Sequence, residues 1–382
     1  MDASVNEVIV VGAGPVGAVS ALALQQHGVA ARVLEARAED ARADTRTLAL
    51  AHGSRLILER IGVWTRLEEA TPITRIHISQ RGALGVTRLS AEALGVPALG
   101  YVLSYAHLTE VLKQALGEAR IAVEYGVPVE RIEPGTGAAR VQAADGRSWS
   151  APLVAVADGG RGAQTPAPRF AHDYAQTAVV CEVRTELAHD GRAFERFTPE
   201  GPAALLPKGD GYALVWTAAS ADAARIAALP DADFLAALQR HFGGRQGLFL
   251  SATPRKTFPL RCIYAGREAG ARVVRIGNAA QTLHPVAGQG FNIGLRDAWE
   301  LARLCADTRA DALGGEAMLR AYARGRRFDV VAGLGFTDFL VRMFSNDVAV
   351  LRHARGLGLL ALEAIPPLKA FVARRMMFGA RG

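Results

Sequence analysis

The sequence predicts a mixed α/β fold in which a helix-covered parallel sheet is interleaved with an antiparallel sheet and followed by a helical C-terminus. Three observations carry this prediction. A strand, a helix and a second strand follow one another at the N-terminus, which requires a parallel sheet. Residues 153–157 and 272–276 are two further short apolar runs that stop at turns, as buried parallel strands do. Between them, residues 177–183, 192–198 and 212–217 alternate as antiparallel strands do.

The elements follow in order along the chain. Residues 7–11 are a β-branched strand, 15–27 a helix closed by Gly28, and 31–34 a strand ending at Glu35. Residues 71–100 are turn-rich and alternating, 108–116 helical, and 121–129 and 139–143 short strands. Helices are expected at 231–241 and 292–306, and from residue 315 onwards. The sequence thus divides into a discontinuous parallel-sheet domain (1–72, 100–165 and 260–344), an antiparallel-sheet domain (73–99 and 166–259) and a C-terminal helical segment (345–382).

Composition restricts the class of protein. Half of the 382 residues are hydrophobic, and 44 basic against 37 acidic residues give a net charge of +7. The basic residues are spread along the chain, so we expect no nucleic-acid partner. Cys181, Cys262 and Cys305 lack metal-binding spacing and are expected to be reduced core residues, with no metal site. We expect no secretory signal and no membrane-spanning helix, and we therefore expect a cytoplasmic protein.

The first chemical motif lies between the first strand and the first helix. Gly12, Gly14 and Gly17 form G-x-G-x-x-G there. The first glycine permits a tight turn, the second lets the backbone approach a pyrophosphate, and the third allows the helix to pack on the strand. Glu35 ends the next strand, where a carboxylate can accept hydrogen bonds from ribose hydroxyls. Together these features predict a dinucleotide site.

A second motif distinguishes a flavin from a nicotinamide dinucleotide. Gly277 and Asn278 follow a buried strand, and the stretch His284 to Asn292 opens the next helix. Small residues let a flat ring lie against the main chain, and the N–H groups of a helix N-terminus stabilise negative charge on the flavin. A plain glycine-rich turn capped by Asn292 would need neither Pro285 nor two glycines around Gln289, so FAD is the predicted cofactor.

A third motif, Asp158 followed by Gly159, comes after residues 153–157. An acid at the carboxyl end of a parallel strand can bind a ribityl or ribose hydroxyl. By itself an Asp-Gly pair is more often a simple turn. It gains weight here only from the other two motifs.

These motifs resemble those of the class A flavin monooxygenases, which have the p-hydroxybenzoate-hydroxylase fold. The resemblance covers essentially the whole chain and is most specific in GNAAQTLHPVAGQGFNIGLRD (277–297). That stretch and GRAFERFTPEGPAALLP (191–207) resemble the ubiquinone-biosynthesis hydroxylases, and most of all their 2-polyprenyl-6-methoxyphenol hydroxylase branch. The chain departs from the class at Asn278, where most members have Asp, and after Asp158, where a serine usually follows in D-G-x-x-S.

The resemblance implies a set of cofactor-binding residues. Arg46, in D-x-R-x-x-A-L, matches the family arginine that reaches towards the cofactor, although a surface arginine is the alternative. Asp158 matches an acid near FAD and the nicotinamide donor, and Asn278 a residue near the ribityl or pyrophosphate part. The full implied set is Gly12, Gly14, Gly17, Glu35, Arg46, Asp158, Gly159, Gly277, Asn278, Pro285, Gly288, Gly290 and Asn292.

The resemblance also implies the reaction. NADH or NADPH would reduce FAD transiently, O₂ would add at flavin C4a, and the hydroperoxide would hydroxylate a polyprenyl phenol in ubiquinone biosynthesis. His284 is a weak candidate for a catalytic base, and a loop-orienting imidazole is the more common role. Glu195 alternates with aromatic neighbours; it can face a pocket, but an exposed glutamate is expected more often.

The C-terminal residues leave one question open. Apolar positions from 357 to 378 are interrupted by Pro366 and Pro367 and accompanied by basic residues. Packing on the flavin domain is the plainer account, and peripheral contact with the inner face of the cytoplasmic membrane is the alternative. Two other functions also stay open: a non-oxygenating flavoprotein similar to polyprenyl reductases or cyclases, and a flavin-bearing scaffold subunit of a quinone-biosynthesis complex.

Overall fold

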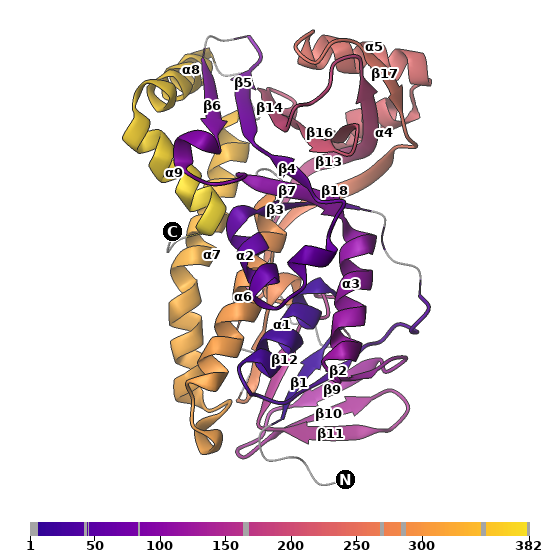
Figure 1. Ribbon diagram of the computed structural model, residues 1–382, viewed down its shortest axis with the longest axis vertical. Helices are drawn as coiled ribbons and strands as arrows, with labels where there is room; N and C mark the ends of the chain where they lie inside the picture. The colour runs from indigo at the N-terminus through magenta and orange to yellow at the C-terminus, as the bar shows by residue number, and fades with distance from the viewer. Residues whose placement is uncertain are drawn as a thin grey trace.

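The computed structural model describes residues 7–41, 44, 46–82, 85–162, 168–267, 271–283, 288–344 and 349–379, with the backbone alone at 342, 344 and 349–352. A five-stranded parallel sheet forms the centre of the lower half in Figure 1. Its order is β19-β12-β1-β2-β8, formed by β1 (Val8–Val11), β2 (Ala31–Leu34), β8 (Ala122–Glu124), β12 (Leu153–Val156) and β19 (Val273–Arg275). β1 and β12 are buried throughout, which explains their continuous apolar sequence.

The two faces of this sheet are covered differently. Val8, Val10 and Val33 pack under α1 (Pro15–Gln26), α3 (Tyr105–Glu118) and α6 (Gln289–Ala306). Ile9 and Val11 point to the opposite face. There they meet a three-stranded antiparallel sheet of β9 (Val129–Glu133), β10 (Ala139–Ala143) and β11 (Ser148–Ala151). This side sheet lies at the bottom of Figure 1.

A larger sheet forms the upper half of the molecule (Figure 1). Its strands run β20-β18-β13-β16-β15-β14-β5-β6, with β17 paired to β13. All its pairs are antiparallel except β14 with β5, which is parallel. The strands are β5 (Arg75–Gln80), β6 (Val86–Ser90), β13 (Phe170–Thr185), β14 (Arg192–Thr198), β15 (Gly201–Lys208), β16 (Gly211–Ala219), β17 (Phe249–Ala252), β18 (Lys256–Tyr264) and β20 (Gln281–Thr282).

One face of the large sheet is closed by helices. Phe234, Leu238 and Phe242 of α5 (Asp231–Phe242) are buried against strands β13 and β16, next to α4 (Ser220–Ala228). The other face looks towards the parallel-sheet half. A small antiparallel sheet lies between the halves, formed by β3 (Thr47–Ala51), β7 (Gly100–Ser104) and β4 (Thr71–Ile73), with α2 (His52–Arg60) directly after β3.

The C-terminal helices join both halves. α7 (Glu316–Phe344) packs on α6, α8 (Ala349–Ala364) on β6, and α9 (Pro366–Phe378) on α2. The Thr87 hydroxyl on β6 donates a 2.8 Å hydrogen bond to the Leu359 carbonyl oxygen. Among the described helices, none alone is long and apolar enough to cross a membrane; residues His353–Ala364 and Pro366–Phe378 pass that test only as a pair, bent by 99°.

The mixed α/β class and the interleaving of two sheets are confirmed. The expected 31–34, 139–143 and 192–198 strands have the predicted bounds. β15 was not predicted, because Pro202 and Pro207 cannot donate ladder hydrogen bonds and make the segment look like a loop. The substrate-side sheet was expected to be antiparallel, and its pairs are antiparallel except for β14 with β5. The three cysteines are free and buried, as expected.

Candidate functional site

Four predicted site residues follow four neighbouring strands of the parallel sheet. Gly12 follows β1, Glu35 follows β2, Asp158 comes just after β12, and Gly277 just after β19. Since parallel strands end at one edge of a sheet, residues far apart in sequence meet there. A cavity of about 1260 Å³ opens at this edge and extends towards the large sheet. It is lined by Gly12, Gly14, Glu35, Arg46, Asp158, Gly159, Asn278, Gly288, Gly290 and Asn292.

The glycines at the start of α1 serve different purposes. A Cβ on Gly17 would lie 1.9 Å from the Gly12 carbonyl oxygen, and one on Gly12 would lie 2.7 Å from the Ala157 carbonyl oxygen. Gly12 also has a φ of +105°. Gly14 differs, because the nearest atom to its Cβ would be the Tyr105 hydroxyl, 3.8 Å away. Gly12 and Gly17 therefore allow tight packing, whereas Gly14 leaves open space beside the first turn of α1.

The Glu35 carboxylate is held at the rim of this space. It accepts hydrogen bonds from the Ala13 amide (2.6 Å), the Arg37 amide (3.0 Å) and the Arg37 Nε (2.9 Å). Burial alone would raise its pKa, but the bonds from Arg37 and Ala13 outweigh burial and lower the pKa. Glu35 is therefore a fixed anion, whose remaining lone pairs can accept hydrogen bonds from a ribose.

Asp158 organises the loop that follows β12. Its two carboxylate oxygens accept hydrogen bonds from the amides of Gly160 (2.8 Å) and Gly162 (3.0 Å). Gly159 has a φ of +73° and Gly160 one of +74°, which this turn requires. Asp158 thus shapes the loop while lining the cavity.

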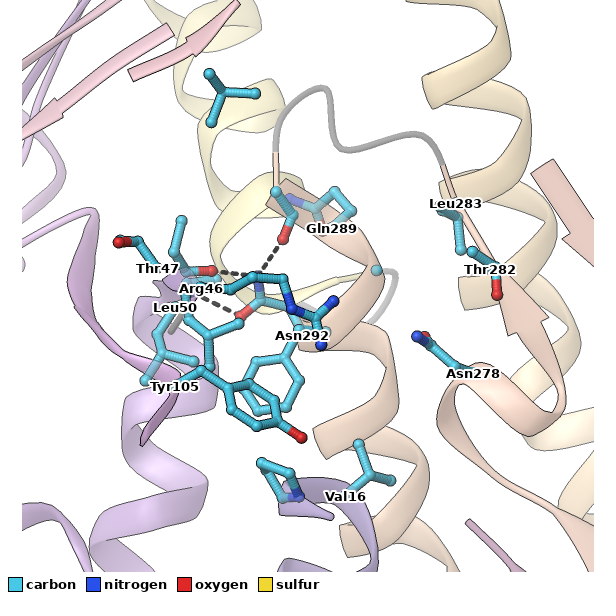
Figure 2. Close-up of a pocket in the computed structure, with 18 of the residues that line it drawn as sticks. Val16, Arg46, Thr47, Leu50, Tyr105, Asn278, Thr282, Leu283, Gln289 and Asn292 are labelled. Atoms are coloured by element: carbon cyan, nitrogen blue, oxygen red, sulfur yellow. Dashed lines mark hydrogen bonds between the residues drawn. The ribbon is translucent and has the colours of Figure 1, made fainter. Parts of the chain in front are cut away.

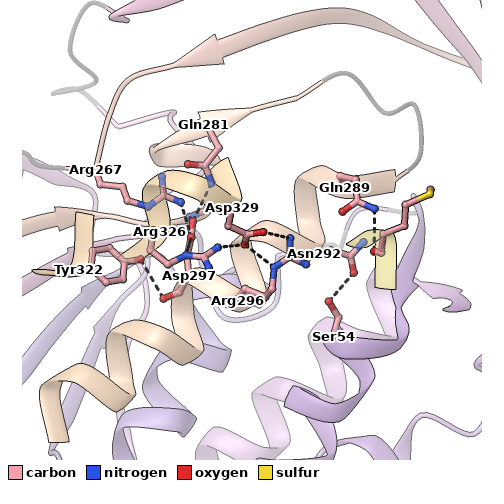
Figure 3. Close-up of polar contacts among 12 residues, drawn as sticks. Ser54, Arg267, Gln281, Gln289, Asn292, Arg296, Asp297, Tyr322, Arg326 and Asp329 are labelled. Carbon is pink, nitrogen blue, oxygen red and sulfur yellow. Dashed lines mark hydrogen bonds and ion pairs between the residues drawn. The ribbon is translucent and has the colours of Figure 1, made fainter. Parts of the chain in front are cut away.

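Asn292 has a structural role at the wall of the cavity. It was predicted to line the flavin ring, and it lines the cavity. Its amide oxygen, however, accepts 2.7 Å hydrogen bonds from the Ala51 amide and the Ser54 hydroxyl, and its nitrogen donates to the carbonyl oxygens of Ala49 and Gly288. The side chain therefore ties the start of α6 to β3 and α2, as Figures 2 and 3 show.

A buried ion network fixes the turn after β19 (Figure 3). The Asp297 carboxylate is fully buried and binds Arg267 Nη2 at 2.5 Å and Arg326 Nε at 2.8 Å. It also accepts hydrogen bonds from the Gln281 side chain (2.9 Å) and the Gly277 amide (3.2 Å). Burial would raise the pKa of Asp297, but the two arginines outweigh it and lower the pKa. The network thereby positions Gly277 and Asn278.

Arg46 lies beside the cavity rather than away from it. Its guanidinium is 5.2 Å from the centre of the Tyr105 ring, and its Nε is 2.6 Å from an Asp44 carboxylate oxygen. In Figure 2, Arg46 and Tyr105 lie on the opposite side of the pocket from Asn278. Tyr105 and Arg37 were not singled out in the sequence, since neither belongs to a recognisable motif.

The other end of the cavity is apolar. The large sheet contributes Ile76, Ile78, Ala193, Phe197, Pro202, Ala204, Leu206 and Val215. Helices α7, α8 and α9 contribute Phe336, Phe339, Leu340, Met343, Leu359, Leu362, Val372, Met376 and Met377. These residues come from segments that are remote in sequence and share no motif, so sequence reasoning missed them.

Glu195 corrects an expectation about which side chains face the cavity. An exposed glutamate was the expected reading, but the side chain lines the cavity on the sheet side. Burial raises the pKa of Glu195 to about 8. His284 and Pro285 lie outside the described residues, so their positions stay predictions.

The glycine-lined edge fits the ADP part of a dinucleotide. It combines open space at Gly14, a helix N-terminus without a side-chain cap, and a fixed carboxylate at Glu35. At the start of α6, Gly288 has a φ of +59° and no side chain caps the helix, which leaves its N–H groups directed at the cavity end. Both halves of a flavin dinucleotide thus meet suitable backbone.

Comparisons with known proteins agree with this geometry. A family model described as an FAD binding domain matches residues 6–332. Ubiquinone hydroxylase UbiL of Rhodospirillum rubrum is 36% identical over 98% of this chain and 90% of its own length. The 3-demethoxyubiquinol 3-hydroxylase of Escherichia coli is 31% identical over 95% of this chain and 96% of its own.

Solved structures share the fold at lower identity. Klebsiella pneumoniae HpxO, complexed with FAD and uric acid, is 21% identical with a TM-score of 0.76, covering 99% of this chain and 98% of its own. PqsL from Pseudomonas aeruginosa, a probable FAD-dependent monooxygenase, is 19% identical with a TM-score of 0.77, covering 93% of this chain and 99% of its own.

Proposed function

We propose a substrate and a reaction for this protein on the basis of its family: the chain belongs to the FAD-dependent monooxygenases of the ubiquinone-biosynthesis hydroxylase family. Its cofactor is FAD, and NADH or NADPH is the reductant typical of the class. Its substrate, in this proposal, is a phenol or quinol ring with a polyprenyl tail, and its product carries one more ring hydroxyl. The observation that carries this proposal is the single cavity that joins the glycine-lined edge to a large apolar chamber.

The residues proposed to hold FAD are those at the strand ends. Gly12, Gly14 and Gly17 allow the pyrophosphate to approach α1, and Glu35 binds the ribose hydroxyls. Asp158, Gly159, Gly277 and Asn278 take the middle of the cofactor. The flavin ring is bordered by Gly288, by Gly290 and by the part of the wall that Asn292 holds in place, with Arg46 reaching from the opposite side. Pro285 is assigned to this site by the resemblance alone.

When bound, FAD supplies the activation of O₂ for transfer to the ring. The chain itself has to orient the substrate ring beside the flavin end of the cavity and keep water out. Ile78, Ala204 and Leu206 of the large sheet offer the ring a flat apolar surface. Leu340, Leu359 and Leu362 continue this surface along α7 and α8, where a prenyl tail would be shielded from water.

The reaction is tested with the purified FAD-loaded protein, NADH or NADPH, and methoxyphenols that carry prenyl tails of increasing length. Under ¹⁸O₂, the product should gain one ¹⁸O atom, and H₂O₂ should account for little of the NAD(P)H consumed. Two results would refute hydroxylation. The phenol could bind while all the reducing equivalents appear in H₂O₂, or it could be hydrogenated at an alkene.

The tail chamber is tested with two glycines on neighbouring helices. Gly358 on α8 lines the cavity and Gly335 on α7 does not, and a Cβ would meet no atom within 4 Å at either. Gly358→Trp should raise KM for long-tailed phenols about tenfold and leave tail-less phenols unchanged, because the indole occupies tail space. Gly335→Trp is the matched control. Equal effects of both variants, or an equal effect on tail-less phenols, would contradict the chamber.

We also propose that the C-terminal helices touch an anionic membrane surface, as the inner face of the cytoplasmic membrane would offer. Most large hydrophobic side chains exposed in the described part of the chain lie on these helices or, for Ile365, between α8 and α9: Phe328, Val331, Phe339, Leu357, Leu360, Ile365, Leu368 and Phe371. Arg375 stacks near both Phe328 (5.8 Å) and Phe371 (5.1 Å), which brings α7 and α9 together. Arg324, Arg327 and Arg374 are exposed on the same helices.

Vesicle sedimentation tests this contact. The protein should bind vesicles rich in phosphatidylglycerol more tightly than phosphatidylcholine vesicles, and salt should weaken the binding. The pair Phe328→Ser and Phe371→Ser should lower binding at least about fivefold. Leu248→Ser with Leu250→Ser removes comparably exposed side chains near β17 and should change nothing. Equal loss in both double variants would exclude a specific role for the C-terminal helices.

We propose that the predicted parallel-sheet domain is the FAD-binding domain and the predicted antiparallel-sheet domain is the substrate domain, with one adjustment of their bounds. β18 is a continuous strand that pairs with β13 across residue 260, so the substrate domain is best extended to Tyr264. The FAD-binding domain then resumes before β19. Residues 1–72 and 100–165 remain with it, and 345–382 remain the C-terminal segment that joins both domains.

A further inference from the structure

Among the described residues, the sheet wall of the cavity carries one ionisable side chain, that of Glu195. Glu195 lies in the middle of β14, opposite Ala204 of β15 and Ile78 of β5. Strand alternation places Ala193, Glu195 and Phe197 on the cavity face. Phe194 and Arg196 point to the other face, where Phe194 joins the core under α5. The direction of Glu195 is therefore set by the packing of its two aromatic neighbours on opposite sides of the sheet.

The surroundings of Glu195 are apolar. The described cavity-lining residues of the large sheet are otherwise uncharged, and Thr217 and Thr282 are their only polar members. Arg355 of α8 lines the same chamber, and Glu35, Arg37, Arg46, Tyr105, Glu130, Asp158 and Arg161 line the cofactor end. Arg37 pairs with Glu35, Arg46 pairs with Asp44, and Arg355 donates a hydrogen bond to the Met343 carbonyl oxygen.

An acid in this position stays protonated at neutral pH. Burial raises the pKa of Glu195 to about 8, without an opposing contribution from a nearby cation. A neutral carboxyl group has one O–H donor and a carbonyl acceptor. A phenol hydroxyl also donates and accepts one hydrogen bond, so the two groups are complementary.

We propose that the Glu195 carboxyl group is the polar anchor of the substrate ring, which it binds by a hydrogen bond to the ring hydroxyl. This inference rests on the proposed phenol hydroxylation. On a smooth apolar wall of Ile78, Ala204 and Leu206, a ring can rotate without losing contact. One directional bond fixes the rotation and therefore which ring carbon faces the flavin end. Glu195 is accordingly a positioning and specificity-determining residue.

Two substitutions separate the anchor from other roles. Glu195→Gln keeps a donor and an acceptor in the same shape, whereas Glu195→Leu removes both. Glu182→Leu is the matched control, because Glu182 lies on β13 of the same sheet with an exposed side chain. The dissociation constant of the phenol is read from the change in flavin absorbance, and ring isomers and H₂O₂ are quantified after turnover.

Glu195→Leu should weaken phenol binding about tenfold, broaden the set of hydroxylated isomers and increase H₂O₂. For an analogue of the phenol that lacks the ring hydroxyl, the dissociation constant of Glu195→Leu should stay within about twofold of that of the original protein. Glu195→Gln should stay within about threefold in every readout, and Glu182→Leu should match the original protein.

Three results would overturn the anchor. Glu195→Leu could bind and hydroxylate as the original protein does, it could weaken the phenol and its deoxy analogue equally, or Glu195→Gln could lose as much as Glu195→Leu. The proposed function fails separately, when the original protein itself neither binds nor hydroxylates phenols.

Discussion

Asp297→Asn should strongly destabilise the protein although Asp297 is not among the described residues that line the cavity. Its carboxylate is fully buried, and Arg267 and Arg326, with side-chain exposures of 4% and 6%, depend on it for charge compensation. Arg326 keeps a second partner, Asp329, at 2.6 Å, whereas no other carboxylate pairs with Arg267 in the described part of the chain. Leaving a buried charge uncompensated costs about 3–5 kcal/mol, and the surviving Asp329 contact favours the lower half of that range.

The assay is urea unfolding of the apoprotein and the FAD-loaded protein, followed by circular dichroism and flavin fluorescence. Asp311→Asn is the control, because its pair with Arg309 is exposed and should contribute less than about 0.5 kcal/mol. FAD affinity should also fall, since Asp297 holds the Gly277 amide. A loss below about 1 kcal/mol, or equal to that of Asp311→Asn, would refute the reasoning.

Three further predictions concern single sites. Gly14→Ala should weaken FAD binding with little change in the stability of the apoprotein. Gly17→Ala should lower the stability of the apoprotein, since the added Cβ would collide with Gly12. Thermal melts and FAD titration distinguish the two effects. The pKa of Glu195 is about 8 in the folded state and 4.5 in the unfolded state, so the free energy of unfolding should fall as pH rises from 4.5 to 8. Glu195→Gln should recover at most about 4–5 kcal/mol of this free energy at pH 8. Parallel pH profiles of the two proteins would contradict this. Burial lowers the pKa of His241 to about 4, so stability should fall as pH drops from 6.5 to 4, by at most about 3 kcal/mol; His241→Phe should remove that loss in acid unfolding curves.

The cofactor half of the site could be predicted from the sequence because its requirements are local. Gly12 and Gly17 are needed where backbone atoms come within van der Waals contact, and Glu35 is needed one residue after a strand. Such constraints fall on fixed positions of a short segment. The same locality explains why β1, α1 and β2 were found close to their observed bounds.

The substrate half could not be predicted in the same way. Whether Glu195 faces the cavity or solvent depends on what covers each face of the large sheet, and α5 lies almost 40 residues away in sequence. Asp297 belongs to a motif, but its partners Arg267 and Arg326 were identified only by the fold. Asn292 was found, yet its bonds to Ala49 and Ala51 show that it shapes the wall.

The division between these halves has a consequence for specificity. In the proposed site, FAD meets mainly the backbone and glycines at the strand ends, so changes to the side chains of the apolar chamber should leave FAD affinity unchanged. The apolar chamber is built instead from side chains of the large sheet and of α7 to α9, which contact each other without sharing sequence. Because α8 packs on β6 and α9 on α2, changes along these helices alter the length and width of the chamber while the strand ends stay fixed. Exchanging residues 349–379 with those of a relative should therefore change the preferred tail length and leave FAD affinity unchanged.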